Sequence, residues 1–139
     1  MKNAFTLIEL IFTIVIIGIL ASVAIVKINA TRVDAKAVKA KENLAVCITD
    51  IASVYTAKGI ETTANNNDAS DYSKACRMVL NDNCFIVDLS NFSDGNITVK
   101  DNNINKKWCN ISQELAHKEA LSAPGQGLLF SFGGSKIKP

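Results

Sequence analysis

The chain has 139 residues, enough for one domain, with 48% hydrophobic residues, 20% charged residues and a formal charge of +2 at pH 7. So small a net charge gives no reason by itself to expect a nucleic-acid partner, and the apolar content with four cysteines excludes intrinsic disorder for most of the chain. The apolar residues gather at one end, because residues 5–26 carry a single charge, Glu9, and no second apolar run of that length follows. This distribution argues against a small soluble enzyme and against a polytopic membrane protein.

Residues 5–26, with the sequence FTLIELIFTIVIIGILASVAIV, predict a helix that is apolar on all sides. At a rise of about 1.5 Å per residue, the run is long enough to span a hydrocarbon core of about 30 Å. No proline interrupts it, and Gly18 and Ser22 are small residues of the kind that pack between membrane helices. A secretory signal peptide is the alternative, because residues 21–24 (ASVA) resemble a cleavage site.

The helical pattern continues beyond residue 26. Apolar residues recur at steps of three and four on one face: Val33, Ala37, Ala40, Leu44, Cys47, Ile48, Ile51 and Tyr55. The other positions carry charged residues: Lys36, Lys39, Lys41, Glu42 and Asp50. No glycine or proline lies between Val26 and Lys58, and Gly59 suits a helix end. We therefore expect one long helix with an apolar first half, 5–26, and an amphipathic second half, 27–58, which carries a domain on one face.

Residues 59–139 predict a small globular domain. The sequence indicates a loop at 60–71, a short helix at 72–81, strands at 85–89, 97–100 and 128–132, and a turn at 93–96. A further helix is expected at 111–121, started by Asn110 or Ser112, and a tail from Gly133. The predicted fold class is α+β, a long N-terminal helix packed on a small antiparallel sheet.

Four cysteines follow the apolar run: Cys47, Cys76, Cys84 and Cys109. They form no CxxC pair and the chain has one histidine, so a structural zinc site lacks its usual spacing. An even number beyond a membrane segment suits two disulfides in an oxidising compartment, with buried free thiols as the alternative. Of the three possible pairings we favour Cys47–Cys76, which would tie the long helix to the domain, and Cys84–Cys109, which would close a β-rich segment.

The start of the chain, Ala4-Phe5-Thr6-Leu7-Ile8-Glu9-Leu10 with the run through Gly18, resembles the type IV prepilins and the type II secretion pseudopilins. The resemblance covers about the first 30 residues, beyond which only the plan of a long helix with a small β-containing domain is shared. In that family a membrane-embedded prepilin peptidase cuts after a small residue and methylates the new amino terminus. The resemblance implies a leader at 1–4, cleavage after Ala4 and methylation of Phe5. Ala4 stands where glycine is usual, and the run lacks the proline that many relatives carry near its end.

Glu9 is the acid that the resemblance assigns to assembly. A charged side chain at the centre of a bilayer costs about 2.5–3.5 kcal/mol even on the lenient insertion scale. Such a residue therefore needs a partner, and the free amine of Phe5, in the same subunit or in a neighbour, is the one expected. The alternative is that Glu9 lies in the headgroup zone and reaches water.

No residue set predicts catalysis, a cofactor or a metal site. His117 lacks visible partners for a triad or a multi-histidine site. The acids among the asparagines fit no EF-hand spacing and suggest solvated turns: Asp82, Asp88, Asp94 and Asp101. Asn96-Ile97-Thr98 and Asn110-Ile111-Ser112 match the N-glycosylation acceptor pattern, which leaves modification of Asn96 open. The basic stretch 27–41 suits a solvated face or a neighbouring subunit, with DNA or anionic lipid as a minor alternative.

The sequence thus predicts a non-enzymatic subunit of a type IV pilus-like filament. Its expected partners are copies of itself and other pilins, the prepilin peptidase, the inner-membrane assembly platform, and the membrane before assembly. The precursor would cross the inner membrane once with its C-terminal domain in the periplasm, and the product would be an extracellular or periplasmic filament. The alternatives are a type II secretion pseudopilin, a minor pilin, or a secreted or membrane-anchored binding domain. Motility, adhesion, secretion and DNA uptake are not distinguished.

Overall fold

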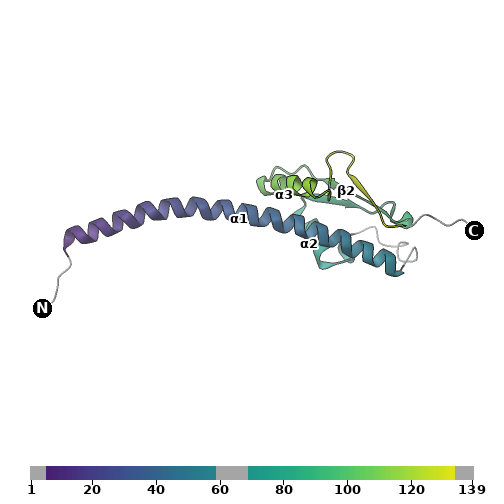
Figure 1. Cartoon of the computed structure of the whole chain (residues 1–139), viewed down its shortest axis with the longest axis horizontal. Helices are drawn as coiled ribbons and strands as arrows, with labels where there is room; N and C mark the ends of the chain where they lie inside the picture. Colours follow the sequence, from purple (N-terminus) through teal and green to yellow (C-terminus); the bar gives the residue numbers. More distant parts are fainter. Residues whose placement is uncertain (1–5, 59–68, 134–139) are drawn as a thin grey trace, which may run out of the picture. The chain divides into compact units, whose positions relative to one another are not determined.

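The computed structural model of the chain describes residues 6–58 and 69–133, and the side chains of residues 23–30, 58 and 93 are outside this description (Figure 1). The elements in chain order are α1 (Leu7–Lys58), the 3₁₀ helix η2 (Ala69–Asp71), α2 (Lys74–Asp82), β1 (Phe85–Asp88), the 3₁₀ helix η3 (Phe92–Asp94), β2 (Asn96–Asp101), α3 (Lys107–Lys118) and β3 (Leu128–Ser131). The chain divides into two compact units, Met1–Asp34 and Ala35–Pro139. The predicted α+β class is confirmed.

The second half of α1 buries the face that its apolar spacing predicts. Six residues of that face are at most 7% exposed: Ala37, Ala40, Leu44, Cys47, Ile48 and Ile51. Four of them, Leu44, Cys47, Ile48 and Ile51, belong to one hydrophobic core with Phe85 and Val87 of β1 and with Ile97 and Val99 of β2. This half of α1 therefore forms one side of the core of the second unit, because packing against the domain removes its apolar face from water.

The sheet is antiparallel with the order β1-β2-β3, and Figure 1 shows β2 among these strands. Val87 pairs with Val99, and Ile97 pairs with Phe130 across the second ladder. The turn expected at 93–96 coincides with η3, after which Gly95 has a φ of 74° and β2 begins at Asn96. A side chain at Gly95 would meet the backbone of Gly133 and the ring of Tyr55, so this turn has room only for glycine.

Two predicted helix starts were wrong. The short helix begins at Lys74 rather than residue 72, because the Ser73 hydroxyl accepts a hydrogen bond from the Cys76 N–H and caps it. Helix α3 begins at Lys107 instead of residue 111, and its N-cap, Lys106, makes no side-chain capping bond. The burial of Cys109 and Ser112, both 0% exposed, extends α3 past the expected caps.

One charged residue of α1, Lys41, is buried, although its place in the sequence pattern lies off the apolar face. Lys41 is 8% exposed, and its Nζ lies 2.7 Å from Glu119 Oε1 and 2.7 Å from Glu42 Oε1. The hydrogen bonds to Glu119 and then to Glu42 raise the pKa of Lys41. The pair with Glu119 joins α1 to the segment that follows α3.

The residue that follows the C-cap of α3 has an unfavourable backbone conformation. Ala120 has a φ of 53°, and the Leu121 N–H donates to the Ala116 carbonyl at 2.9 Å, as in a Schellman cap. Because glycine avoids the clash of Cβ in this region and Ala120 is exposed, we expect Ala120→Gly to raise the free energy of unfolding by about 0.5–1 kcal/mol. Ala120→Val should lower it. Urea unfolding of the two variants beside the wild type measures both, and equal midpoints would contradict the prediction.

Candidate functional site

The first turn of α1 is closed by a reciprocal set of hydrogen bonds between Thr6 and Glu9. The Thr6 N–H and hydroxyl donate to Glu9 Oε2 at 3.0 and 2.8 Å, and the Glu9 N–H donates to the Thr6 carbonyl at 3.1 Å. The carboxylate thus satisfies an N–H that a helix start otherwise leaves without a partner, as the glutamate of a capping box does. The Thr-x-x-Glu spacing at residues 6–9 is the sequence signal for this cap, and it was not among the predicted helix starts.

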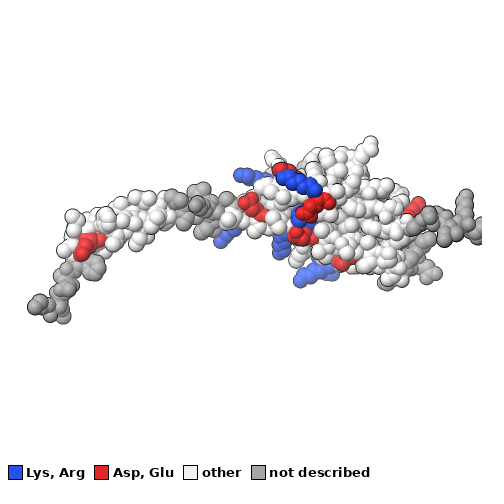
Figure 2. All heavy atoms as spheres, in the orientation of Figure 1, with Lys and Arg blue, Asp and Glu red and all other residues white. Residues whose placement is uncertain are grey.

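The helix after Glu9 exposes an almost uncharged surface. Eleven large apolar side chains between Leu7 and Leu20 are 40–77% exposed. Thr13 and Ser22 donate their hydroxyls to the carbonyls of Leu10 and Ile19, both at 2.8 Å, so they add little polarity. Figure 2 shows this segment as white atoms beside one acidic side chain. Soluble monomers rarely expose so long an apolar surface, which suits contact with lipid or with other apolar helices.

The described residues include no helix that is long and apolar enough to cross a membrane. The predicted leader 1–4, with Ala4 at the expected cleavage site, and Phe5, expected as the methylated residue, lie outside the described residues. Most of the predicted loop 60–71 and the tail from 134 lie outside them as well.

All four cysteines are bonded in pairs. Cys47 of α1 is linked to Cys76 of α2, and Cys84, next to β1, is linked to Cys109 of α3. This is the pairing favoured from the sequence. All four side chains are 0% exposed, so both crosslinks lie inside the core of the second unit.

His117 has a partner that the sequence did not reveal. Its Nε2 lies 2.6 Å from Asp101 Oδ2, and the Ser122 hydroxyl donates to Asp101 Oδ1 at 2.8 Å. The carboxylate stands between the hydroxyl and the imidazole, so His117 is not placed to take a proton from Ser122 as a triad histidine would. The three side chains instead fasten the last turn of α3 and the following segment to the end of β2.

The acids among the described residues form no metal site, and the sequons lie in regular secondary structure. Over the described residues, no three His, Cys, Asp or Glu side chains gather as a metal site would require. Asn96 is a half-buried residue of the central strand β2, and Ser112 of the second sequon is 0% exposed in α3.

Asp88 closes the turn after β1. The Ser90 N–H donates to Asp88 Oδ1 at 2.9 Å, and the Lys100 Nζ lies 3.8 Å from Oδ2. The hydrogen bonds from the Ser90 backbone and side chain, and then the charge of Lys100, lower the pKa of Asp88 below its ordinary 3.8.

Because the pKa of Asp88 is lowered on folding, the stability that its carboxylate contributes is complete above pH 3.8 and is lost as the pH falls through the folded-state pKa. We therefore expect Asp88→Asn to be less stable than the wild type at pH 6 and to approach it near pH 2. Urea midpoints at the two pH values measure this. A stability difference independent of pH would show that the charge of Asp88 is not involved.

Comparison with known proteins bears on the N-terminal segment alone. Residues 1–25 match a family model described as the prokaryotic N-terminal methylation motif. This motif is the hallmark of type IV pilins and pseudopilins, so the resemblance noted at the start of the chain is confirmed. No curated protein and no solved structure matches the chain.

Proposed function

We propose that this chain is a structural subunit of a type IV pilus-like filament and has no catalytic activity of its own. The proposal rests on one segment that combines two features. Residues 1–25 match the methylation motif, and eleven large apolar side chains between Leu7 and Leu20 are exposed. The motif belongs to structural subunits rather than enzymes. An apolar surface of this length has to be covered, and neighbouring helices in a filament core would cover it.

Before assembly, lipid would cover the same surface. In this proposal the precursor is held in the inner membrane by residues 5–26, and its C-terminal domain lies in the periplasm. The two buried disulfides support a periplasmic location of the C-terminal domain, because such bonds form and persist in oxidising compartments. The prepilin peptidase would cut after Ala4 and methylate Phe5, and the assembly platform would then move the subunit from lipid into the filament.

Glu9 would set the position of each subunit in the filament. Moving an apolar helix from lipid into a bundle of similar helices changes its surroundings little, so packing and the pairing of polar groups decide the register. The amine of a neighbouring Phe5 is the proposed partner of the Glu9 carboxylate.

Intact-mass and N-terminal peptide mass spectrometry on protein from the native host test the proposal. A chain that begins at N-methylated Phe5 and has lost residues 1–4 is the expected result. A chain cut after Ala24, or one that keeps Met1, would refute it and favour a secreted or membrane-anchored binding domain.

Pilin, minor pilin and pseudopilin differ in copy number within this proposal. Quantifying the chain in sheared surface filaments separates them, because a major pilin dominates that fraction whereas a minor pilin or a pseudopilin is a trace component.

A further inference from the structure

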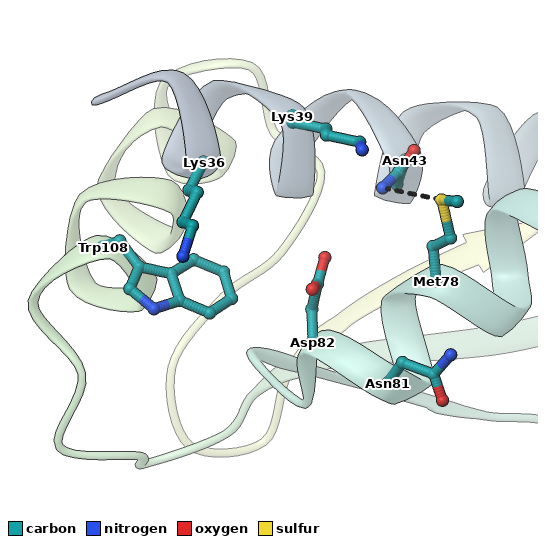
Figure 3. A pocket seen from close by; sticks show the side chains of 7 residues that line it. All are labelled: Lys36, Lys39, Asn43, Met78, Asn81, Asp82 and Trp108. Carbon is teal, nitrogen blue, oxygen red and sulfur yellow. Dashed lines mark hydrogen bonds between the residues drawn. The ribbon is translucent and has the colours of Figure 1, made fainter. Parts of the chain in front are cut away.

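A hollow in the second unit carries an inference that is independent of filament assembly. It has a volume of about 360 Å³ and is lined by seven residues: Lys36, Lys39, Asn43, Met78, Asn81, Asp82 and Trp108. They come from α1, α2 and α3. Figure 3 shows the Lys36 side chain extending from α1 toward the indole of Trp108, and the Asp82 side chain rising from α2 between the indole and Met78. This volume lies at the small end of the range for ligand pockets, about 300–1,000 Å³.

The helices that border the hollow are held together before any ligand arrives. The Asn43 Nδ2 donates to Met78 Sδ at 3.7 Å, and one helical turn further along, the Cys47–Cys76 disulfide holds α1 against α2. Trp108 packs against the hydrophobic core, and its neighbour Cys109 is bonded to Cys84. The helices that border the hollow therefore need not move to admit a ligand, and only exposed side chains such as Lys36 and Lys39 are ordered on binding.

The polar groups of the hollow are available to a ligand. Within the described part of the chain, no hydrogen bond or ion pair engages the side chains of four lining residues: Lys36, Lys39, Asn81 and Asp82. Two ammonium groups, an amide and a carboxylate therefore border one space together with an indole ring. Lys106 Nζ, 5.8 Å from the centroid of that ring, adds a third positive charge nearby.

We propose that this hollow binds a carboxylated sugar unit, such as one hexuronic acid residue of an acidic polysaccharide. Lys106 Nζ lies over one face of the indole ring. The opposite, electron-rich face would receive the C–H groups of a pyranose, just as it does other partially positive edges. The amide and the Asp82 carboxylate hydrogen-bond to sugar hydroxyls, which donate and accept at once. Lys36 and Lys39 supply the charge-assisted contacts that a single carboxylate prefers.

Asp82 argues against nucleic acid as the occupant. A strand of phosphates is held by a groove that is positive along its length, with bases stacked on aromatic rings. Here the Asp82 carboxylate borders the same hollow as the lysines and the indole, and it would repel each added phosphate while it accepts a hydroxyl at no such penalty. A sugar unit with one carboxylate and several hydroxyls in the hollow therefore fits this set better than a nucleotide unit with its phosphates does.

Trp108 is the only tryptophan in the chain, so its fluorescence reports on this site alone. We would titrate a galacturonic acid trimer into the full-length protein in a sugar-free detergent and compare a neutral galactose trimer and hexathymidylate. The expected result is a saturable change with the acidic trimer and weaker binding of the other two. Lys36→Met with Lys39→Met should weaken the acidic trimer roughly tenfold or more, because hydrogen bonds to charged groups are the stronger ones. Lys74→Met, on the exposed start of α2, is the matched control and should change nothing.

Asp82→Asn separates the sugar from a polyanion. The asparagine amide accepts hydrogen bonds from hydroxyls more weakly than the carboxylate does, so the substitution should reduce the affinity for both trimers. It also removes the negative charge of Asp82, which should increase the affinity for hexathymidylate. The proposal is overturned if the acidic trimer causes no saturable change, if the neutral trimer binds equally well, or if hexathymidylate binds more tightly than the acidic trimer. Circular dichroism and melting curves check that each variant is folded, which the exposed lysine variants should be in any case.

Discussion

Removing the Cys47–Cys76 disulfide by Cys47→Ala with Cys76→Ala is expected to lower the free energy of unfolding by roughly 3–4 kcal/mol, from the chain entropy released by opening a loop of this length. The crosslinked residues are 29 apart in sequence. Alanine is the proper replacement because both sites are 0% exposed, and a serine hydroxyl there would be buried without a partner. Urea unfolding of the full-length chain in detergent, with and without the crosslink, gives the difference.

The Cys84–Cys109 crosslink provides the matched control. It spans 25 residues, so the entropy of its loop is nearly the same. The same region is also held by Gln113, whose Nε2 donates to the carbonyls of Cys84 and Asn102 at 2.8 and 2.9 Å. Between α1 and α2 the only comparable contact that involves described side chains is the bond of Asn43 to Met78 sulfur, a weak acceptor.

We therefore expect Cys84→Ala with Cys109→Ala to destabilise the domain less than the first pair of substitutions. A loss below about 1 kcal/mol for the first pair, or a larger loss for the second, would contradict this account of how α2 is attached to α1.

The sequence predicted those parts of the fold that depend on local patterns. Helix α1 follows from apolar steps of three and four without a glycine or proline before Lys58, and the strands follow from short apolar runs between turn residues. The predicted start of α3 was wrong. Asn110 and Ser112 are favourable capping residues by local preference, but the burial of Cys109 keeps the preceding residues in the helix.

The contacts that the sequence did not predict join residues far apart in the chain. His117 meets Asp101, 16 residues earlier, because the chain brings the last turn of α3 to the end of β2. Lys41 is buried because Glu119, 78 residues later, supplies its counter-charge. The hollow beside Trp108 is lined by residues from three helices, and no local sequence motif marks its polar residues. By contrast, the proposed roles of Ala4, Phe5 and Glu9 come from one contiguous motif, which is why residues 1–25 sufficed to suggest them.

Replacing Glu9 by leucine is expected to reduce surface filaments on the order of a hundredfold while the chain is still processed and held in the membrane. Glu9→Leu leaves the amine of Phe5 without its partner, and an unpaired charge in an apolar core costs about 2.5–3.5 kcal/mol. A free-energy difference of that size corresponds to a change of roughly a hundredfold in an equilibrium constant. Leucine makes residues 5–26 more apolar, so a defect in membrane insertion cannot explain the loss. The measurement is the ratio of the chain in sheared filaments to the chain in membranes, with mass spectrometry of Phe5 as the check on processing.

Glu9→Gln separates the charge of Glu9 from its contribution to the helix start. The glutamine oxygen can still accept from the Thr6 N–H and hydroxyl, which now donate to Glu9 at 3.0 and 2.8 Å, but it cannot pair with an amine as an ion. If the carboxylate positions subunits by neutralising the amine of a neighbouring Phe5, then Glu9→Gln must fail to assemble about as severely as Glu9→Leu. Glu9→Asp, which keeps the charge on a shorter side chain, must retain more filaments than either. Assembly of Glu9→Gln at the wild-type level would instead assign Glu9 to capping α1, and the register of the filament would then depend on the packing of the apolar helices alone.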